Sequence, residues 1–168
     1  MLRQGHYGVS LIAFAPVGFV LVRLGRPELA FVVGAAMLWL AMLPDVDHRI
    51  PGVPHRGPTH SLAFAALVGG VFAGVGQALA SAGVGNVGPA AVADGSVVVF
   101  AFLVGFLTVF AHLLGDALTP AGVNFLWPLS GRTYSLSLWT AGNSVANYGL
   151  FGVGVFAVAG ALYLAATV

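Results

Sequence analysis

A chain of 168 residues with 59% hydrophobic and 7% charged residues departs far from a soluble domain, in which about a quarter of residues are charged. One water-soluble core of this size cannot absorb so much apolar surface. The net charge is +1, and the basic residues are scattered arginines, which excludes a basic nucleic-acid-binding patch. Cysteine is absent, which excludes disulfides and thiolate metal ligands.

Five apolar stretches follow one another along the chain. Each approaches the about 17 to 25 residues that a membrane-spanning helix needs, except the short second one, which gains length if it begins at Pro27. Backbone groups inside a bilayer must be satisfied within their own segment, so we expect helices. The sequence therefore predicts an all-α fold, a polytopic membrane helical bundle with about five transmembrane helices. We expect one integral membrane domain over residues 1–168, with spans at residues 7–24, 28–43, 61–80, 96–115 and 145–166.

The first stretch has some features of a cleaved signal peptide, because Arg3 precedes an apolar run that contains the small-residue site 13–15. Pro16 follows that site directly, and the apolar run continues beyond it. We therefore expect the first span to be retained as a membrane helix.

The remaining segments carry weaker signals. Residues 81–95 are rich in Gly and small residues and predict a loop. The connector 116–143 contains Trp127, Tyr134 and Trp139, which are typical of the lipid headgroup level. Glycines in the third and fifth spans either allow close helix contact or reflect the general tolerance of membrane helices for glycine.

The five His and five acidic residues are distributed unevenly. Eight of the ten lie at residue 6, between residues 45 and 60, or at residues 112 and 116, and only Glu28 and Asp94 lie elsewhere. With five spans, these clusters fall at the start of the first, the end of the second, the start of the third and the end of the fourth. All four helix ends are then on one side of the membrane. This convergence is the strongest functional signal in the sequence.

Each cluster alone has an ordinary explanation. His112 and Asp116 are one helical turn apart, and such a pair is often only hydrogen-bonded. The sequence from Pro44 to His48 is also typical of a turn after a helix, and a loop residue such as His55 is usually solvated. Several carboxylates brought together at membrane depth repel one another, and a divalent cation removes that cost. Mixed His and Asp ligands favour zinc, manganese or iron over calcium or magnesium.

Three motifs taken together resemble the YdjM-like family of predicted membrane-bound metal-dependent hydrolases. They are Leu-Pro-Asp-Val-Asp-His at residues 43–48, His-Arg-Gly-Pro-Thr-His-Ser at residues 55–61, and His-Leu-Leu-Gly-Asp-Ala-Leu-Thr-Pro-Ala-Gly at residues 112–122. The likeness spans residues 6–128. It implies a helical membrane protein with metal-dependent hydrolase activity and an unsettled substrate.

That family is in turn distantly similar to the zinc-dependent phospholipase C and single-strand nuclease superfamily. By order of motifs, the resemblance implies that the metal ligands are His6, Asp45, His60, His112 and Asp116. Members of the superfamily use further His and acidic ligands near the C-terminus, whereas no His or Asp follows Asp116 here. We therefore expect one or two divalent ions, with zinc favoured and manganese or iron as alternatives.

The resulting hypothesis is hydrolysis of a phosphoester at the membrane surface, either a phospholipid or another phosphoester. Arg56 would clamp a phosphate oxygen, because its planar fork matches that geometry. Asp47, His48 and His55 would orient the ligands or move protons.

Two other functional classes stay open. The metal would instead be structural if it only held the four helix ends together, and sequence cannot separate that site from a catalytic one. A metal or ion transporter is less favoured, because the spans have almost no polar groups between their ends. The oligomeric state is not predicted. Four arginines on the cluster side against two on the other predict a multi-pass protein of the cell membrane with its metal site in the cytoplasm.

Overall fold

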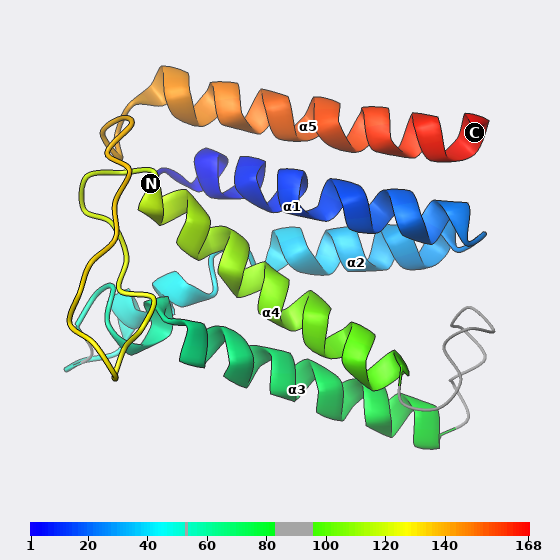
Figure 1. Cartoon of the computed structure of the whole chain (residues 1–168), viewed down its shortest axis with the longest axis horizontal. Coiled ribbons are helices and arrows are strands. Elements are labelled where there is room, and N and C mark those ends of the chain that lie inside the picture. Colours follow the sequence, from blue (N-terminus) through cyan, green and yellow to red (C-terminus); the bar gives the residue numbers. More distant parts are fainter. Residues whose placement is uncertain (53, 83–95) are drawn as a thin grey trace.

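The computed structural model describes residues 1–52, 54–82 and 96–168, and over these residues the chain is helical (Figure 1). The α-helices are α1 Arg3–Arg23, α2 Pro27–Trp39, α3 Leu62–Ser81, α4 Ser96–Ala117 and α5 Ser144–Thr167, and the 3₁₀ helices η1 Pro44–Arg49 and η2 Pro58–His60 lie between α2 and α3. Five segments are long and apolar enough to cross a membrane, the second of them comprising residues 27–49. The predicted all-α membrane bundle of about five helices is confirmed.

The short second helix has a local cause. It begins with Pro27, which has no N–H to leave unsatisfied in the first turn, and it ends at Trp39. Pro44 cannot donate to the carbonyl of Leu40, so the α-helical bonds cannot continue. The chain instead makes i to i+3 bonds, from Leu43 N to Leu40 O (2.8 Å) and from Val46 N to Leu43 O (3.1 Å). These bonds lead the chain into η1, which carries the first two acidic residues of the cluster.

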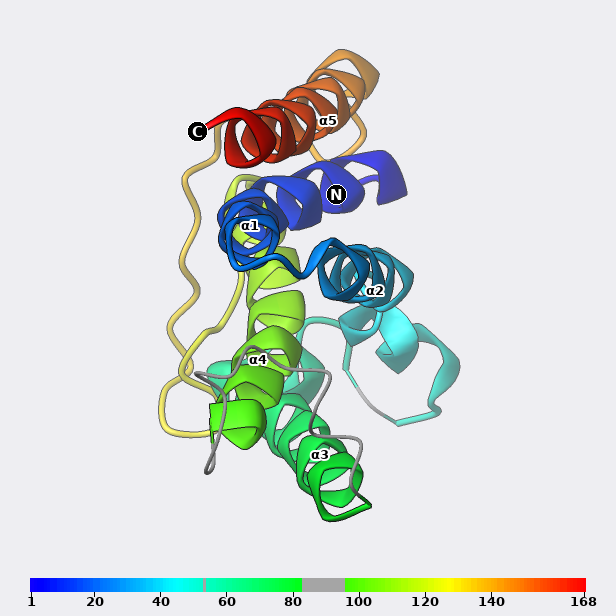
Figure 2. The same ribbon diagram turned by 90° about the vertical axis from the view of Figure 1, so that its right-hand side faces the viewer.

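The most extensive helix contacts are between α1 and α5 and between α3 and α4, and α4 also contacts α1. Helix α1 packs along α5 and also contacts α2, while α3 packs along α4, which crosses toward α1 (Figures 1 and 2). At the α1–α5 contact a Cβ atom on Gly154 would lie 2.6 Å from the carbonyl oxygen of Gly8. Gly69 is similarly close to Phe102 of α4, whereas nothing lies within 4 Å of a Cβ at Gly152. Both interpretations of the glycines therefore apply, at different positions.

The outward surfaces of the helices are apolar. Phe31 of α2 is 78% exposed and Phe156 of α5 is 79% exposed, and only 11% of the most apolar window of α5 is buried inside the protein. In lipid such surfaces have a compatible solvent, and contacts between helices depend on close packing and small residues. The exposure pattern therefore fits a bundle surrounded by hydrocarbon.

All the segments that carry the His and Asp clusters meet at one end of the bundle. Helices α1, α3 and α5 begin there and α4 ends there, at the left of Figure 1. The connector between α4 and α5 folds back over this end, where Leu136 N donates to Ala117 O (2.7 Å) and Val123 pairs with Tyr134. Asp94 and most of the predicted loop 81–95 lie outside the described residues.

Candidate metal centre

Four helix ends supply the five residues predicted to hold metal. His6 lies in the first turn of α1, Asp45 in η1, His60 at the end of η2, and His112 and Asp116 in the last two turns of α4. The structure brings all five side chains together in overlapping groups whose nitrogen and oxygen atoms lie within 4.8 Å of one another. Four of them are at most 1% exposed, and the side chain of Asp45 is 21% exposed.

Four potential ligand atoms converge at the centre of this cluster. His60 Nε2 lies 3.3 Å from His112 Nε2 and 3.3 Å from Asp45 Oδ1. Asp45 Oδ1 is also 3.5 Å from His112 Nε2. Asp116 Oδ2 completes the set, at 3.5 Å from His60 Nε2 and 3.8 Å from His112 Nε2. His60 Nε2 and His112 Nε2 thus each lie within 3.8 Å of the other three atoms.

The other nitrogen of each imidazole shows where its proton lies. His112 Nδ1 is 2.8 Å from the carbonyl oxygen of Ala41, an acceptor, so Nδ1 carries the hydrogen. His60 Nδ1 is 3.2 Å from Asp47 Oδ2 and 3.0 Å from the hydroxyl of Thr59. In the neutral imidazoles both Nε2 atoms therefore present lone pairs to the centre.

This donor set fits a metal ion. Four acceptor atoms that face one another repel, and a proton can join one pair of them but not all four. A tetrahedral cation with ligands at about 2.0–2.2 Å separates them by ~3.3–3.6 Å, and the five separations given above, from 3.3 to 3.8 Å, lie close to that range. Two imidazoles with two carboxylates also match the ligand preference of zinc and its neighbours.

His6 extends the cluster on one side. Its ring stacks on His112, with centroids 3.8 Å apart and planes 1° from parallel, and its Nε2 lies 3.6 Å from Asp116 Oδ1. Among the described residues, its Nδ1 is buried without a hydrogen-bond partner. Gly115 makes room for this ring, because a Cβ there would lie 3.0 Å from His6 Nδ1. His6 is thus placed to serve a second ion that shares Asp45 or Asp116.

Asp47 supports the centre from behind. Its buried carboxylate accepts hydrogen bonds from Thr59 Oγ1 (2.9 Å) and Arg56 N (3.2 Å) and contacts His55 Nδ1 (3.1 Å). Together with its contact to His60, this is the carboxylate–histidine arrangement that orients metal ligands in many proteins. Sequence reasoning did not assign Thr59 a role in this network, because a single loop threonine has no spacing or charge that marks it.

Arg56 joins two parts of the site. Its guanidinium donates to Asp116 Oδ1 (3.0 Å) and to the carbonyl oxygen of Gly122 (2.6 Å), while its backbone, with φ of 62°, donates to Asp47. The amino group of Met1 also donates to Asp116 Oδ1 (3.1 Å). The contacts shown by the structure therefore orient Asp116, and the expected contact of Arg56 with a phosphate stays a prediction.

The remaining two predicted residues lie on the outer side. The rings of His48 and His55 have centroids 3.8 Å apart, and with Asp45 and Asp47 they form a further group of potential ligands within 4.8 Å. Both imidazoles are exposed. Asp47 already has four contacts within the protein, so this group is better suited to holding His60 and exchanging protons than to holding a cation itself.

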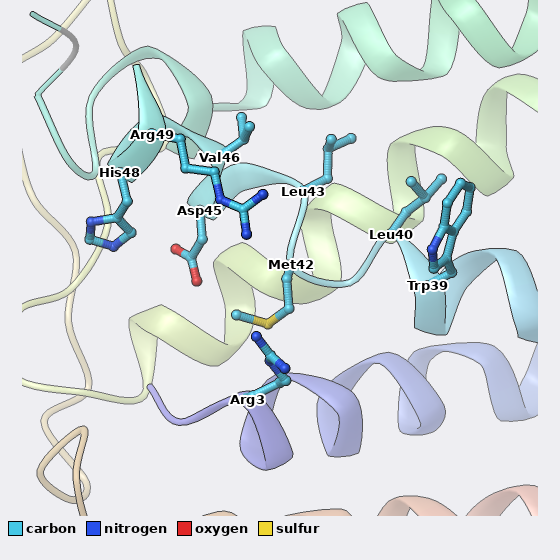
Figure 3. A pocket seen from close by; sticks show the side chains of 9 residues that line it. All are labelled: Arg3, Trp39, Leu40, Met42, Leu43, Asp45, Val46, His48 and Arg49. Carbon is cyan, nitrogen blue, oxygen red and sulfur yellow. The ribbon is translucent and has the colours of Figure 1, made fainter. Parts of the chain in front are cut away.

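One side of the centre opens to a pocket of about 440 Å³. Figure 3 shows Asp45 on its wall, between residues from η1 and the start of α1. Asp45 thus belongs to both the inner cluster and the pocket. A molecule in the pocket would reach the centre from the side of Asp45.

Comparison with known proteins gives one match. A family model described as YdjM inner membrane protein matches residues 1–168, the whole sequence. Searches of curated proteins and of solved structures found no match.

Proposed function

The chain belongs to the YdjM family of inner membrane proteins, and from that premise we propose that it is a membrane-bound metal-dependent hydrolase acting on a phosphoester at the membrane surface. The alternatives of a structural metal site and of an ion path use the same residues. They differ from an enzyme in one feature, which is whether an outside molecule can reach the metal ligands.

The observation that carries the proposal is the unequal burial of the ligand set. His60, His112 and Asp116 are buried, and two His with one carboxylate is a ligand set found in catalytic zinc sites. The side chain of Asp45, the fourth member, is 21% exposed and lies on the pocket wall. Structural sites are closed on all sides, whereas catalytic sites keep one accessible position. With His60, His112 and Asp116 as the protein ligands, the position on the pocket side, beside Asp45, would be the accessible one, which supports catalysis.

Each residue then has a role that follows from its contacts. His60, His112 and Asp116 would hold a divalent cation, with zinc favoured by the donor set. Such a cation, when bound, would supply an activated water and stabilise charge on a phosphoryl oxygen. Asp47 orients His60, and Arg56 orients Asp116. His48 and His55 are exposed beside the pocket, and an imidazole near neutral pH can accept and return the proton of the reaction.

We also propose that the centre faces the cytoplasm. The end of the bundle that carries the centre also carries four arginines, Arg3, Arg49, Arg56 and Arg132. Arginine favours cytoplasmic segments. The chain has no cysteine, so single-cysteine variants can be labelled from one side of the membrane. Thr140→Cys should be protected from an impermeant thiol reagent in intact cells, and Thr167→Cys should react. The reverse pattern would refute the proposed orientation.

The hydrolase proposal is tested by metal analysis of the purified protein together with a panel of phosphomonoester and phosphodiester substrates. We expect bound zinc, zinc-dependent turnover and loss of both in His60→Ala. Glu28→Gln is the control, because this carboxylate is exposed at the opposite end. Bound zinc without turnover of any phosphoester would favour the structural site, and absence of bound metal would refute both.

A further inference from the structure

The pocket beside Asp45 has chemistry that the metal centre does not use. It is lined by Arg3 from the first turn of α1, by Trp39 and Leu40 from the end of α2, and by a segment that includes His48 and Arg49. Its volume of about 440 Å³ lies within the range of roughly 300–1,000 Å³ that is typical of small-molecule sites. Figure 3 shows Arg49 above and Arg3 below the level of the Asp45 carboxylate, with the side chain of Met42 between the two arginines.

The two arginines are available for a ligand. Both side chains are exposed, and over residues 1–52, 54–82 and 96–168 neither guanidinium has a hydrogen bond or an ion pair. Their one acidic neighbour in the pocket, Asp45, is directed to His60 and His112. Two unpaired guanidinium groups in one pocket provide planar forks that match phosphate oxygens.

The pocket also borders the lipid-facing surface. Trp39 is 84% exposed, and tryptophan prefers the level of the lipid headgroups. Phe31, Val32 and Ala35 are exposed on the same face of α2 as Trp39, one to two turns away from it. These apolar side chains are exposed along α2 up to Trp39, a residue of the pocket lining.

We propose that the pocket binds the phosphate headgroup of a membrane amphiphile, with Arg3 and Arg49 holding the phosphate and the acyl chains lying along the exposed face of α2. This inference rests on the proposed function only in naming that amphiphile as the substrate class, since headgroup binding does not itself require turnover. Charge complementarity favours an anionic group, and the exposed apolar side chains along α2 favour a ligand that comes from the bilayer. A phosphate held there lies beside Asp45, on the accessible side of the centre.

The test measures binding by native mass spectrometry of the purified chain in a non-ionic detergent. The probes are dioleoyl phosphatidic acid, dioleoylglycerol, which lacks the phosphate, and glycerol 3-phosphate, which lacks the chains. We expect the parent protein to bind phosphatidic acid at least tenfold more tightly than either of the others. The pair Arg3→Gln and Arg49→Gln should weaken that binding about tenfold or more, because both charged contacts are lost.

A matched control removes the same charge elsewhere. Arg23→Gln combined with Arg132→Gln should bind phosphatidic acid as the parent does, since Arg23 lies at the other end of α1 and Arg132 packs on Tyr134. A thermal unfolding curve checks each variant. If the Gln pair unfolds early, Arg3→Lys with Arg49→Lys keeps both charges and should weaken binding severalfold through loss of the planar forks.

Three results would overturn the proposal. They are unchanged phosphatidic acid binding in the arginine pair, equal binding of glycerol 3-phosphate, which indicates a soluble phosphate ligand, and equal binding of dioleoylglycerol, which indicates a merely apolar site. Binding is measured with zinc and after chelator treatment. Absence of hydrolysis of any phosphoester would refute the proposed function, but the binding measurement would still test the headgroup site.

Discussion

Replacement of Asp47 tests how much the residues that support the proposed metal ligands contribute to metal binding, without changing a ligand. The carboxylate is fully buried, and it contacts His60 Nδ1 at 3.2 Å, Thr59 Oγ1 at 2.9 Å and His55 Nδ1 at 3.1 Å. Asp47 is not one of the four atoms at the centre, so changing it leaves every proposed inner ligand in place. Any loss of metal affinity must then act through the orientation and basicity of His60.

The structure predicts different costs for two substitutions. In Asp47→Asn the amide oxygen can take the place of Oδ2 and keep the donors from Thr59, Arg56 and His60, so mainly the negative charge is lost. We expect about tenfold weaker zinc binding, ~1.4 kcal/mol, the lower end of the effects that such supporting residues have. Asp47→Ala removes the acceptor as well. It should weaken zinc about 100-fold and lower the free energy of unfolding by about 1–3 kcal/mol, because buried donors lose their partner.

The assay is competition for zinc with a chromogenic chelator in detergent, combined with thermal unfolding of the metal-free protein. Glu28→Gln provides the control, since it removes a carboxylate at the far, exposed end of the bundle and should leave zinc affinity unchanged. Zinc affinity within twofold of the parent in both Asp47 variants would refute the reasoning, because His60 would then need no support from Asp47.

Three further predictions follow from the described contacts. His60→Ala and Asp116→Ala should each lose zinc and thermal stability together, as measured by metal analysis and unfolding, because a cation that ties separate helices contributes to folding free energy; retention of full zinc content would contradict this. Gly115→Ala should destabilise the protein by about 1–3 kcal/mol in thermal unfolding, since its Cβ would press on His6 at 3.0 Å, and an unchanged unfolding midpoint would mean that His6 can move away freely. Gly154→Ala should destabilise the protein by a similar amount, because its Cβ would lie 2.6 Å from a backbone oxygen of α1. Gly152→Ala, whose Cβ would meet nothing within 4 Å, should be neutral or slightly stabilising. Equal effects of the two substitutions would refute the close α1–α5 contact.

The helices of this protein could be predicted from sequence because their signal is strong and local. A run of about 20 apolar residues has few alternatives to a membrane helix. The early end of α2 at Trp39 was harder to predict from sequence. The apolar run continues to Leu43, whereas the missing N–H of Pro44 ends the helix. Hydropathy reflects the free energy of transferring side chains to lipid. It carries little information on where α-helical backbone hydrogen bonds give way to 3₁₀ bonds.

The candidate site was partly predictable for a different reason. Counting spans places His6, Asp45, His60, His112 and Asp116 at one membrane face without any knowledge of packing, and the structure brings these five together. Pairing within the cluster depends on the exact path of η1 and η2, which no periodicity encodes.

Arg3 and Arg49 show the same limit. In the sequence they indicate only membrane orientation, because an arginine near a helix end usually reports topology. Both residues line one pocket, and this depends on how α1 packs against the turn after α2. That packing is a tertiary property, so neither residue could be assigned to a ligand site from sequence.

The spread of the centre over the chain has a consequence for biogenesis. His6 and Asp45 are synthesised early, but His112 and Asp116 belong to the last turns of α4. A membrane-inserted intermediate that ends before α4 therefore lacks half of the four central ligand atoms and carries unneutralised acidic groups at its membrane face. If the centre holds the proposed metal, loading follows insertion of the fourth span, and cells short of that metal should accumulate inserted chains with an unfilled centre.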